Sequence, residues 1–134
     1  MKIRICTALM LAFALLLTLG LGACAEKLTE KNSVLVSAVD KDGNVLFSQR
    51  VKASKDALNA LTAFEEAAKK ANVLQVCAGG FPASIGNIAG ELSAGWLMFV
   101  DGEILRISMA EKGLYAGQTL EARFVTYADY FPAN

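Results

Sequence analysis

An uncharged, largely apolar run from Ile5 to Ala23 limits which part of this chain can join a folded domain. Lys2 and Arg4 precede the run, and the small residues Gly22 and Ala23 close it. A basic start, an apolar centre and small residues at the exit are typical of a secretory signal peptide. The segment is therefore not expected to join the folded domain, and its removal would leave 111 of the 134 residues to fold.

The residue after this run is Cys24, directly behind Leu21, Gly22 and Ala23. This ending resembles a bacterial lipoprotein signal, in which a peptidase cuts before the cysteine and the thiol becomes a thioether to diacylglycerol. The resemblance implies a bacterial cell-envelope location, with Cys24 acylated and anchored to the outer face of a membrane. An uncleaved membrane helix and a soluble secreted product remain open, because 19 uncharged residues come close to the about 20 that span a bilayer.

These features divide the chain into three parts. Residues 1–23 are expected to be the signal peptide. Residues 24–32 are expected to be the lipidated cysteine and a polar tether, because the stretch is rich in charged side chains and shows no periodicity. Residues 33–134 are expected to form the folded domain.

The composition of residues 24–134, the part that would remain after cleavage, argues against several kinds of active site, metal site and partner. The chain has no His, so it cannot supply a Ser-His-Asp triad, a Cys-His pair or a His-ligated metal. Without Lys2 and Arg4, 11 basic residues face 13 acidic ones and form no basic stripe, which argues against nucleic acid as a partner. Because no matched acid, nucleophile or metal constellation is present, we expect a protein that is not an enzyme and holds no metal or cofactor.

The cysteines of the chain indicate that the folded domain has no disulfide and is stabilised by its packed core alone. Cys6 would leave with the signal peptide and the lipid would consume the thiol of Cys24, so Cys77 would stand alone. An exported domain with one thiol has no internal disulfide. Cys77 lies in an apolar stretch, so we expect a buried small side chain rather than a reactive thiol.

The first half of the domain predicts a hairpin followed by a helix. Two β-prone stretches, 33–40 and 45–51, flank Asp42-Gly43, a dipeptide typical of tight turns. A helix is expected from Ser54 to Asn72, with Ser54 capping its free N–H groups and apolar residues recurring at helical spacing.

The second half of the domain predicts mainly short strands. Strands are expected at 73–77, 95–100, 104–108 and 119–127, and the glycine-rich stretch 78–88 is expected to be a loop. Several short strands with one helix predict an α+β domain with the helix on one face of the sheet. Because there is a single crossover helix, the sheet is expected to be mixed rather than all-parallel.

Four short motifs follow one another in the second half: Gly79-Gly80-Phe81, Ser84-Ile85-Gly86-Asn87-Ile88, Gly95-Trp96 and Val100-Asp101-Gly102. Together with the hairpin and the helix, they resemble the transcobalamin C-terminal-like family over about residues 34–127. That family supplies the small β-domain that closes over vitamin B12 in animal cobalamin carriers, and it also occurs in bacterial lipoproteins. The resemblance implies a β-grasp-like fold, a mixed sheet with one main helix packed on one face.

The resemblance also implies a ligand site at the end of the sheet that carries the tryptophan strand. The residues it indicates are Trp96, Ile104, Leu105, Ile107, Ser108 and Met109, with Phe81 and Pro82 as neighbours. A corrin ring is broad and apolar with amide fringes, so an aromatic and aliphatic surface with a few polar groups suits it. Trp96 fits a ligand contact and a core residue equally well. If the aliphatic side chains of residues 104–109 form an exposed patch, that patch would favour ligand recognition over a role in core packing.

The function implied by these resemblances is a membrane-anchored, extracytoplasmic ligand-binding lipoprotein that captures cobalamin or a related corrinoid. The chain has no room for the α-helical barrel that completes the clamp in animal carriers. We therefore expect a transporter or an α-barrel protein as a partner that receives or encloses the ligand. The alternative is a cell-surface adhesion or scaffold module with no small-molecule ligand, which holds another protein by a sheet edge or an apolar loop.

Replacing the predicted lipid acceptor tests the anchor. Cys24→Ser removes the sulfur that would carry the lipid, so the variant is expected to leave the membrane fraction and to lose palmitate labelling. Fractionation and metabolic labelling measure both effects, and Cys77→Ser, which keeps the predicted acceptor, should behave as the unchanged protein does. Continued labelling of Cys24→Ser would contradict the lipid anchor.

Overall fold

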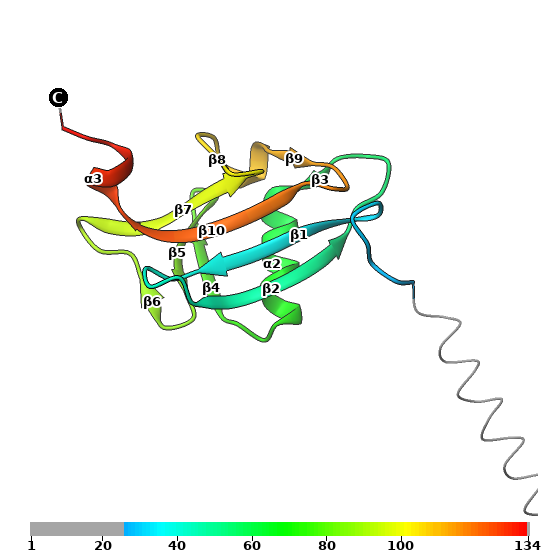
Figure 1. Ribbon diagram of the computed structural model, residues 1–134, viewed down its shortest axis with the longest axis horizontal. Coiled ribbons are helices and arrows are strands. Elements are labelled where there is room, and N and C mark those ends of the chain that lie inside the picture. The colour runs from blue at the N-terminus through cyan, green and yellow to red at the C-terminus, as the bar shows by residue number, and fades with distance from the viewer. Residues whose placement is uncertain (1–25, 134) are drawn as a thin grey trace, which may run out of the picture.

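The first and last strands of the domain meet at the centre of its main sheet (Figure 1). The computed structural model describes residues 26–133, so the predicted signal peptide and Cys24 lie outside the described residues. The strands are β1 (Ser33–Val39), β2 (Val45–Lys52), β3 (Leu58–Asn59), β4 (Gln75–Ala78), β5 (Phe81–Ile85), β6 (Ile88–Ala89), β7 (Ala94–Val100), β8 (Glu103–Ile104), β9 (Gly113–Leu114) and β10 (Thr119–Thr126). The helices are α2 (Ala60–Lys70), α3 (Tyr127–Tyr130) and the 3-10 turn η1 (Met109–Glu111).

The main sheet has five strands in the order β2-β1-β10-β7-β8. β1 and β10 are parallel, with Val36 opposite Leu120, and the other neighbours are antiparallel. A three-stranded sheet, β4-β5-β6, and the two-stranded pair β3-β9 complete the domain. The expected α+β fold with a mixed sheet and one main helix is therefore confirmed.

The β1–β2 turn is a hydrogen-bonded loop around Asp40. One carboxylate oxygen of Asp40 accepts from the backbone N–H groups of Asp42 (2.9 Å) and Asn44 (2.8 Å), and Gly43 adopts a φ of 83°. Hydrogen bonds from the side chain and backbone of Asn44 hold the pKa of the Asp40 carboxyl below its usual value. The Asp-Gly signal in the sequence therefore marks a tight turn, as expected.

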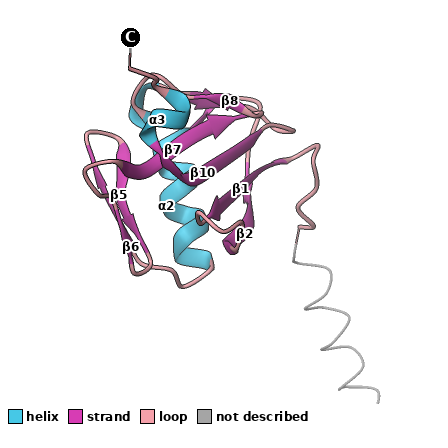
Figure 2. Ribbon diagram, turned by 60° about the vertical axis from the view of Figure 1, so that its left-hand side comes forward, coloured by secondary structure: helices cyan, strands magenta, loops and turns pink. Residues whose placement is uncertain are grey.

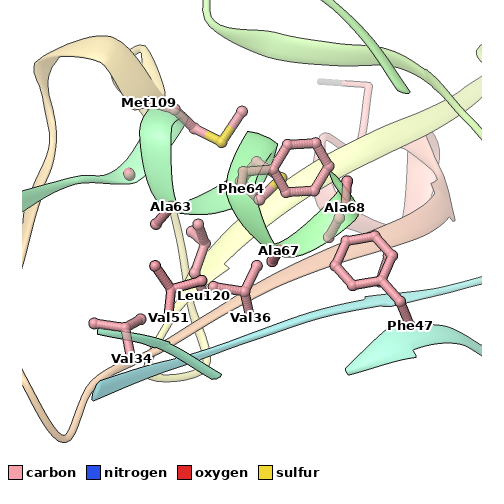
Figure 3. Packing of buried hydrophobic residues seen from close by; sticks show 14 of the residues in the cluster. Val34, Val36, Phe47, Val51, Ala63, Phe64, Ala67, Ala68, Met109 and Leu120 are labelled. Atoms are coloured by element: carbon pink, nitrogen blue, oxygen red, sulfur yellow. The ribbon is translucent and has the colours of Figure 1, made fainter. Parts of the chain in front are cut away.

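Helix α2 packs on one face of the main sheet, which Figure 2 shows behind β1 and β10. Its buried side is mostly alanine, so the helix backbone can approach the strands closely. Phe64 is the large residue of this side, and its ring lies 5.9 Å from that of Phe47 on β2. Figure 3 shows part of this core, including Val34, Val36, Val51, Ala63, Ala67, Ala68, Met109 and Leu120.

The helix starts later than the sequence predicted. Ser54 does not cap it, because the chain passes through the short strand β3 first and α2 begins at Ala60. Asn59 is the N-cap, and its side-chain oxygen accepts from the N–H of Thr62 at 3.2 Å. The same side chain donates to the carbonyl of Ala110 at 2.6 Å, so a distant partner decides where the helix begins. The predicted end is confirmed, since Asn72 adopts a left-handed φ of 56° just after the helix.

The predicted loop at 78–88 is wrong, because this stretch forms strands β5 and β6. Gly79 and Gly80 turn β4 back into β5, and both have positive φ angles. Ile85 is fully buried in the core, and Ile88 packs against that core, as their apolar character predicted. Periodicity failed here because the strands are short and the glycines sit in their turns.

Within residues 26–133, the structure contains no helix that could span a bilayer.

Removing Asn59, the N-cap in the structure, should lower the free energy of unfolding more than removing Ser54, the predicted N-cap. Asn59→Ala loses the cap of α2 and the bond to Ala110, so we expect about 1 kcal/mol less stability, within the measured range for such caps. Ser54→Ala is the matched control and should stay within about 0.5 kcal/mol. Urea unfolding of the two variants measures both values. An equal loss for both would contradict the assignment of the cap to Asn59.

Candidate functional site

An apolar hollow of about 330 Å³ opens beside the tryptophan strand. Its lining combines three aromatic, three aliphatic and one basic residue: Phe81, Trp96, Phe131, Leu97, Ile104, Leu105 and Arg106. The hollow exists because β8 pairs with Phe99 and Val100 at the far end of β7, and the chain then leaves the sheet. The edge of β7 at Trp96 and Leu97 is therefore not covered by β8.

Trp96 is both a core residue and a wall of this hollow. It is 4% exposed, and its indole N–H donates to the carbonyl of Ile88 at 2.9 Å. Its ring meets that of Phe124 edge to face, with 5.3 Å between the ring centroids. These contacts fix the orientation of the indole, because the buried N–H has its partner and the ring is held by the core. Trp96 is therefore a core residue that also lines the hollow, and its contact with a ligand stays a prediction.

The strand expected at 104–108 does not form, because β8 ends at Ile104. Ile104 ends β8 and Leu105 still bonds to the sheet, its N–H donating to the carbonyl of Met98 at 2.7 Å. Both side chains line the hollow. Ile107 is 46% exposed but does not line it, and Met109 is fully buried in the core near Ala63 and Phe64 (Figure 3). The apolar side chains of this stretch therefore divide between the hollow, the solvent and the core.

Ser108 and the β4–β5 turn hold this stretch in place. The Ser108 hydroxyl caps η1 by accepting from the N–H of Ala110 at 3.1 Å. The N–H of Met109 donates to the carbonyl of Gly80 at 3.0 Å. Phe81 follows this turn and reaches the hollow, whereas Pro82, the next residue, is buried and does not line it. Ser108, predicted as a ligand contact, thus caps η1 and does not line the hollow.

Three lining residues were missed by the sequence analysis: Leu97, Arg106 and Phe131. Arg106 is the charged group of the lining, and no carboxylate of the described residues forms an ion pair with it. Phe131 arrives from the C-terminal end, because the α3 turn bonds the N–H of Phe131 to the carbonyl of Tyr127 at 2.7 Å. A pairing between the chain end and a mid-chain strand leaves no local signal in the sequence.

A second hollow, of about 320 Å³, lies between the β1–β2 turn and strand β6. It is lined in part by Asp40, Asp42, Asn87 and Glu91. Across residues 26–133, no three acidic or thiol side chains are arranged to hold a metal ion. Both carboxylate oxygens of Asp40 already accept hydrogen bonds from Asp42 and Asn44 within the β1–β2 turn. The residues around this hollow therefore do not form a binding site for an ion.

Cys77 is only half-buried, on the β4 strand, and its thiol contacts the side-chain oxygen of Gln75 at 3.0 Å. Burial, with the nearby charge of Glu65 as a smaller cause, raises the pKa of the Cys77 thiol to about 11. At neutral pH the group is therefore protonated and a poor nucleophile, which agrees with the expected unreactive thiol.

Two solved structures are similar in fold to this chain. One similar structure is haptocorrin in complex with Cbi, with a TM-score of 0.53, 16% identity and 78% of this chain covered. This chain spans 27% of the haptocorrin chain. Another is a protein from Ruminococcus gnavus provisionally described as metal-binding, with a TM-score of 0.51, 13% identity, and coverage of 71% of this chain and 97% of that chain.

No family model matches the sequence, and no curated protein matches it. At 16% and 13% identity, the two likenesses show a shared fold and a remote relationship. The fold expected from the sequence motifs is thus supported, and membership of the transcobalamin C-terminal-like family stays a prediction.

The contact between the β4–β5 turn and Ser108 can be tested with two glycines. A Cβ at Gly80 would lie 1.7 Å from the Ser108 hydroxyl oxygen, whereas a Cβ at Gly79 would meet nothing within 4 Å. Both positions have positive φ, so Gly79→Ala should cost about 1–2 kcal/mol from backbone strain alone. Gly80→Ala should cost about 1–3 kcal/mol more from overpacking.

Thermal unfolding measures the loss of stability in each glycine variant. The fluorescence emission of Trp96 reports whether the wall of the hollow moves. We expect a changed emission spectrum for Gly80→Ala and an unchanged one for Gly79→Ala. Equal costs and equal spectra would show that this turn does not position the wall.

Proposed function

We propose that this protein is a lipid-anchored, extracytoplasmic binding module that presents its apolar hollow to a corrinoid such as cobalamin. One observation carries the proposal. Phe81, Trp96, Ile104 and Leu105, four residues that the sequence resemblance indicated, come from three separate segments and line a single hollow. The likeness to haptocorrin, a protein solved in complex with Cbi, supports the same class of ligand.

The chemistry of the hollow suits one apolar edge of a large polar-rimmed ligand. The rings of Phe81 and Phe131 offer apolar surface. The indole of Trp96, although only 4% exposed, is held rigidly, so little side-chain entropy is lost where a ligand touches it. Arg106 offers donors to a carbonyl, amide or phosphate oxygen at the rim. The chain's own groups would thus supply shape and hydrogen bonds, since it has no His to coordinate cobalt.

The size of the hollow indicates that the domain works with a partner. Its volume of about 330 Å³ lies at the lower end of the range of about 300–1,000 Å³ for small-molecule sites. A corrinoid is larger than this space, so most of its surface would stay outside. The proposal therefore includes a second protein, a transporter or an α-barrel protein, that covers the rest of the ligand and receives it.

An adhesion or scaffold role is the second candidate, and one surface favours it. Strand β4 and the residue before it carry the exposed apolar side chains Leu74 and Val76, 85% and 60% exposed, away from the hollow. No charged residue occurs between Asn72 and Glu91, so the whole β4-β5-β6 sheet is uncharged. An uncharged sheet with apolar side chains on its surface is typical of a protein contact.

Titration with cyanocobalamin and with cobinamide separates these functions. We expect quenching of Trp96 fluorescence that saturates. Phe131→Ala should weaken binding by about tenfold, because it removes one exposed aromatic wall of the hollow. Leu92→Ala, at a fully exposed residue outside the hollow, is the matched control and should bind as the unchanged protein does. No saturable quenching by either ligand, or equal weakening by both variants, would favour the scaffold role instead.

A further inference from the structure

The segment that joins the predicted anchor to the first strand is folded onto the domain. Glu26 forms an ion pair with Lys52 at the end of β2. The side-chain oxygen of Asn32 accepts from the N–H of Thr29 at 2.7 Å, and the backbone N–H of Asn32 donates to the carbonyl of Thr29 at 3.2 Å. Ser33 is buried and its hydroxyl also donates to Thr29. These contacts fix the direction in which the chain leaves the domain toward its N-terminus.

The distance from this segment to the lipid would be short. After the proposed cleavage, Cys24 and Ala25 alone would precede Glu26. Two residues reach at most about 7 Å in an extended chain. A lipid on Cys24 would therefore hold Glu26, and the end of the domain that Glu26 contacts, close to the membrane surface.

The surface at this end has the composition of a lipid contact. It is a shallow hollow of about 440 Å³, lined by Lys31, Asn32, Ala53, Ser54, Lys55, Tyr115 and Ala116, and we name it the anchor-side surface. Backbone hydrogen bonds join its three segments, from Ala53 to Asn32 (2.8 Å) and from Gly117 to Ser33 (3.0 Å). The lining contains two lysines and no carboxylate, and Tyr115 is 57% exposed.

Each of these groups has a known preference at a bilayer. Lysine stems lie along apolar surface while their ammonium groups reach the headgroups, and anionic lipids attract them. Tyrosine is enriched at the level of the headgroups, because its ring is apolar and its hydroxyl is polar. A lipid chain together with basic groups is the combination that gives stable membrane association.

We propose that the anchor-side surface docks on anionic phospholipid headgroups and orients the domain on the membrane. The inference rests on the proposed lipid anchor at Cys24. In Figure 1 and Figure 2 the chain enters β1 at one end of the domain, and α3, which leads to Phe131, lies at the other. The docked domain therefore holds the Trp96 hollow away from the bilayer, open to a ligand and to a partner protein.

The orientation can be measured with a fluorophore attached at either end of the lipidated protein. Tyr115→Cys places the label on the anchor-side surface, and Leu92→Cys places it at a fully exposed residue in the loop after β6, at the opposite end. Both carry Cys77→Ala so that one thiol reacts. The probes are vesicles of phosphatidylcholine with phosphatidylglycerol that contain a lipid with a nitroxide headgroup as quencher.

We expect the label at residue 115 to be quenched several-fold more than the label at residue 92. Vesicles of phosphatidylcholine alone should reduce the difference. Lys31→Gln with Lys55→Gln should lower the ratio of docked to undocked protein by about 25-fold, at about fivefold per lysine. The double variant keeps the lipid, so it should still sediment with the vesicles.

Two results would overturn the proposal, and they are distinguishable. Equal quenching at both positions in protein that sediments with the vesicles would leave the anchor intact and contradict the orientation. Failure of the lipidated protein to sediment with either kind of vesicle would remove the anchor, and the docking with it, while the corrinoid titration would still decide the role of the hollow.

Discussion

The fold depends on the position of the last strand, β10, between β1 and β7. Because β1 and β10 are parallel, the chain cannot join the hairpin to the rest of the sheet by a tight turn, and it must cross one face. Helix α2 makes that crossing, and its alanine-rich side lets it lie close to the strands. One face of the sheet is thereby covered by a core that includes the fully buried Phe64, and β5 of the β4-β5-β6 sheet contacts β7.

The hollow is a consequence of unequal strand lengths at the sheet edge. β7 has seven residues and β8 has two, so the outer edge of β7 is covered at one end and open at Trp96. The chain after β8 turns back because Met109 is buried in the core and Ser108 lies against Gly80. The core holds the Trp96 wall of this hollow in a fixed orientation, which favours binding by shape.

How far the sequence predicts this structure depends on the range of the interactions involved. The β1–β2 hairpin and the C-terminal end of α2 were predictable, because Asp42-Gly43 and Asn72 act on their own neighbours. The start of α2 was not, because the side chain of Asn59 bonds to Ala110, 51 residues away. The motifs indicated Trp96, Phe81, Ile104 and Leu105, yet nothing local distinguishes Leu105 in the hollow from Met109 in the core. Phe131 could not be found, since its place depends on the path of the chain end.

The proposed ligand surface of the domain is formed by the residues around Trp96. The most direct measurement is a map of amide and indole chemical-shift changes in isotope-labelled protein during addition of cyanocobalamin. We expect changes that cluster at the Trp96 indole N–H, at Leu105 and Arg106, and at Phe131, as this proposal requires. Changes confined to the uncharged β4-β5-β6 sheet, or no change at saturating ligand, would contradict it.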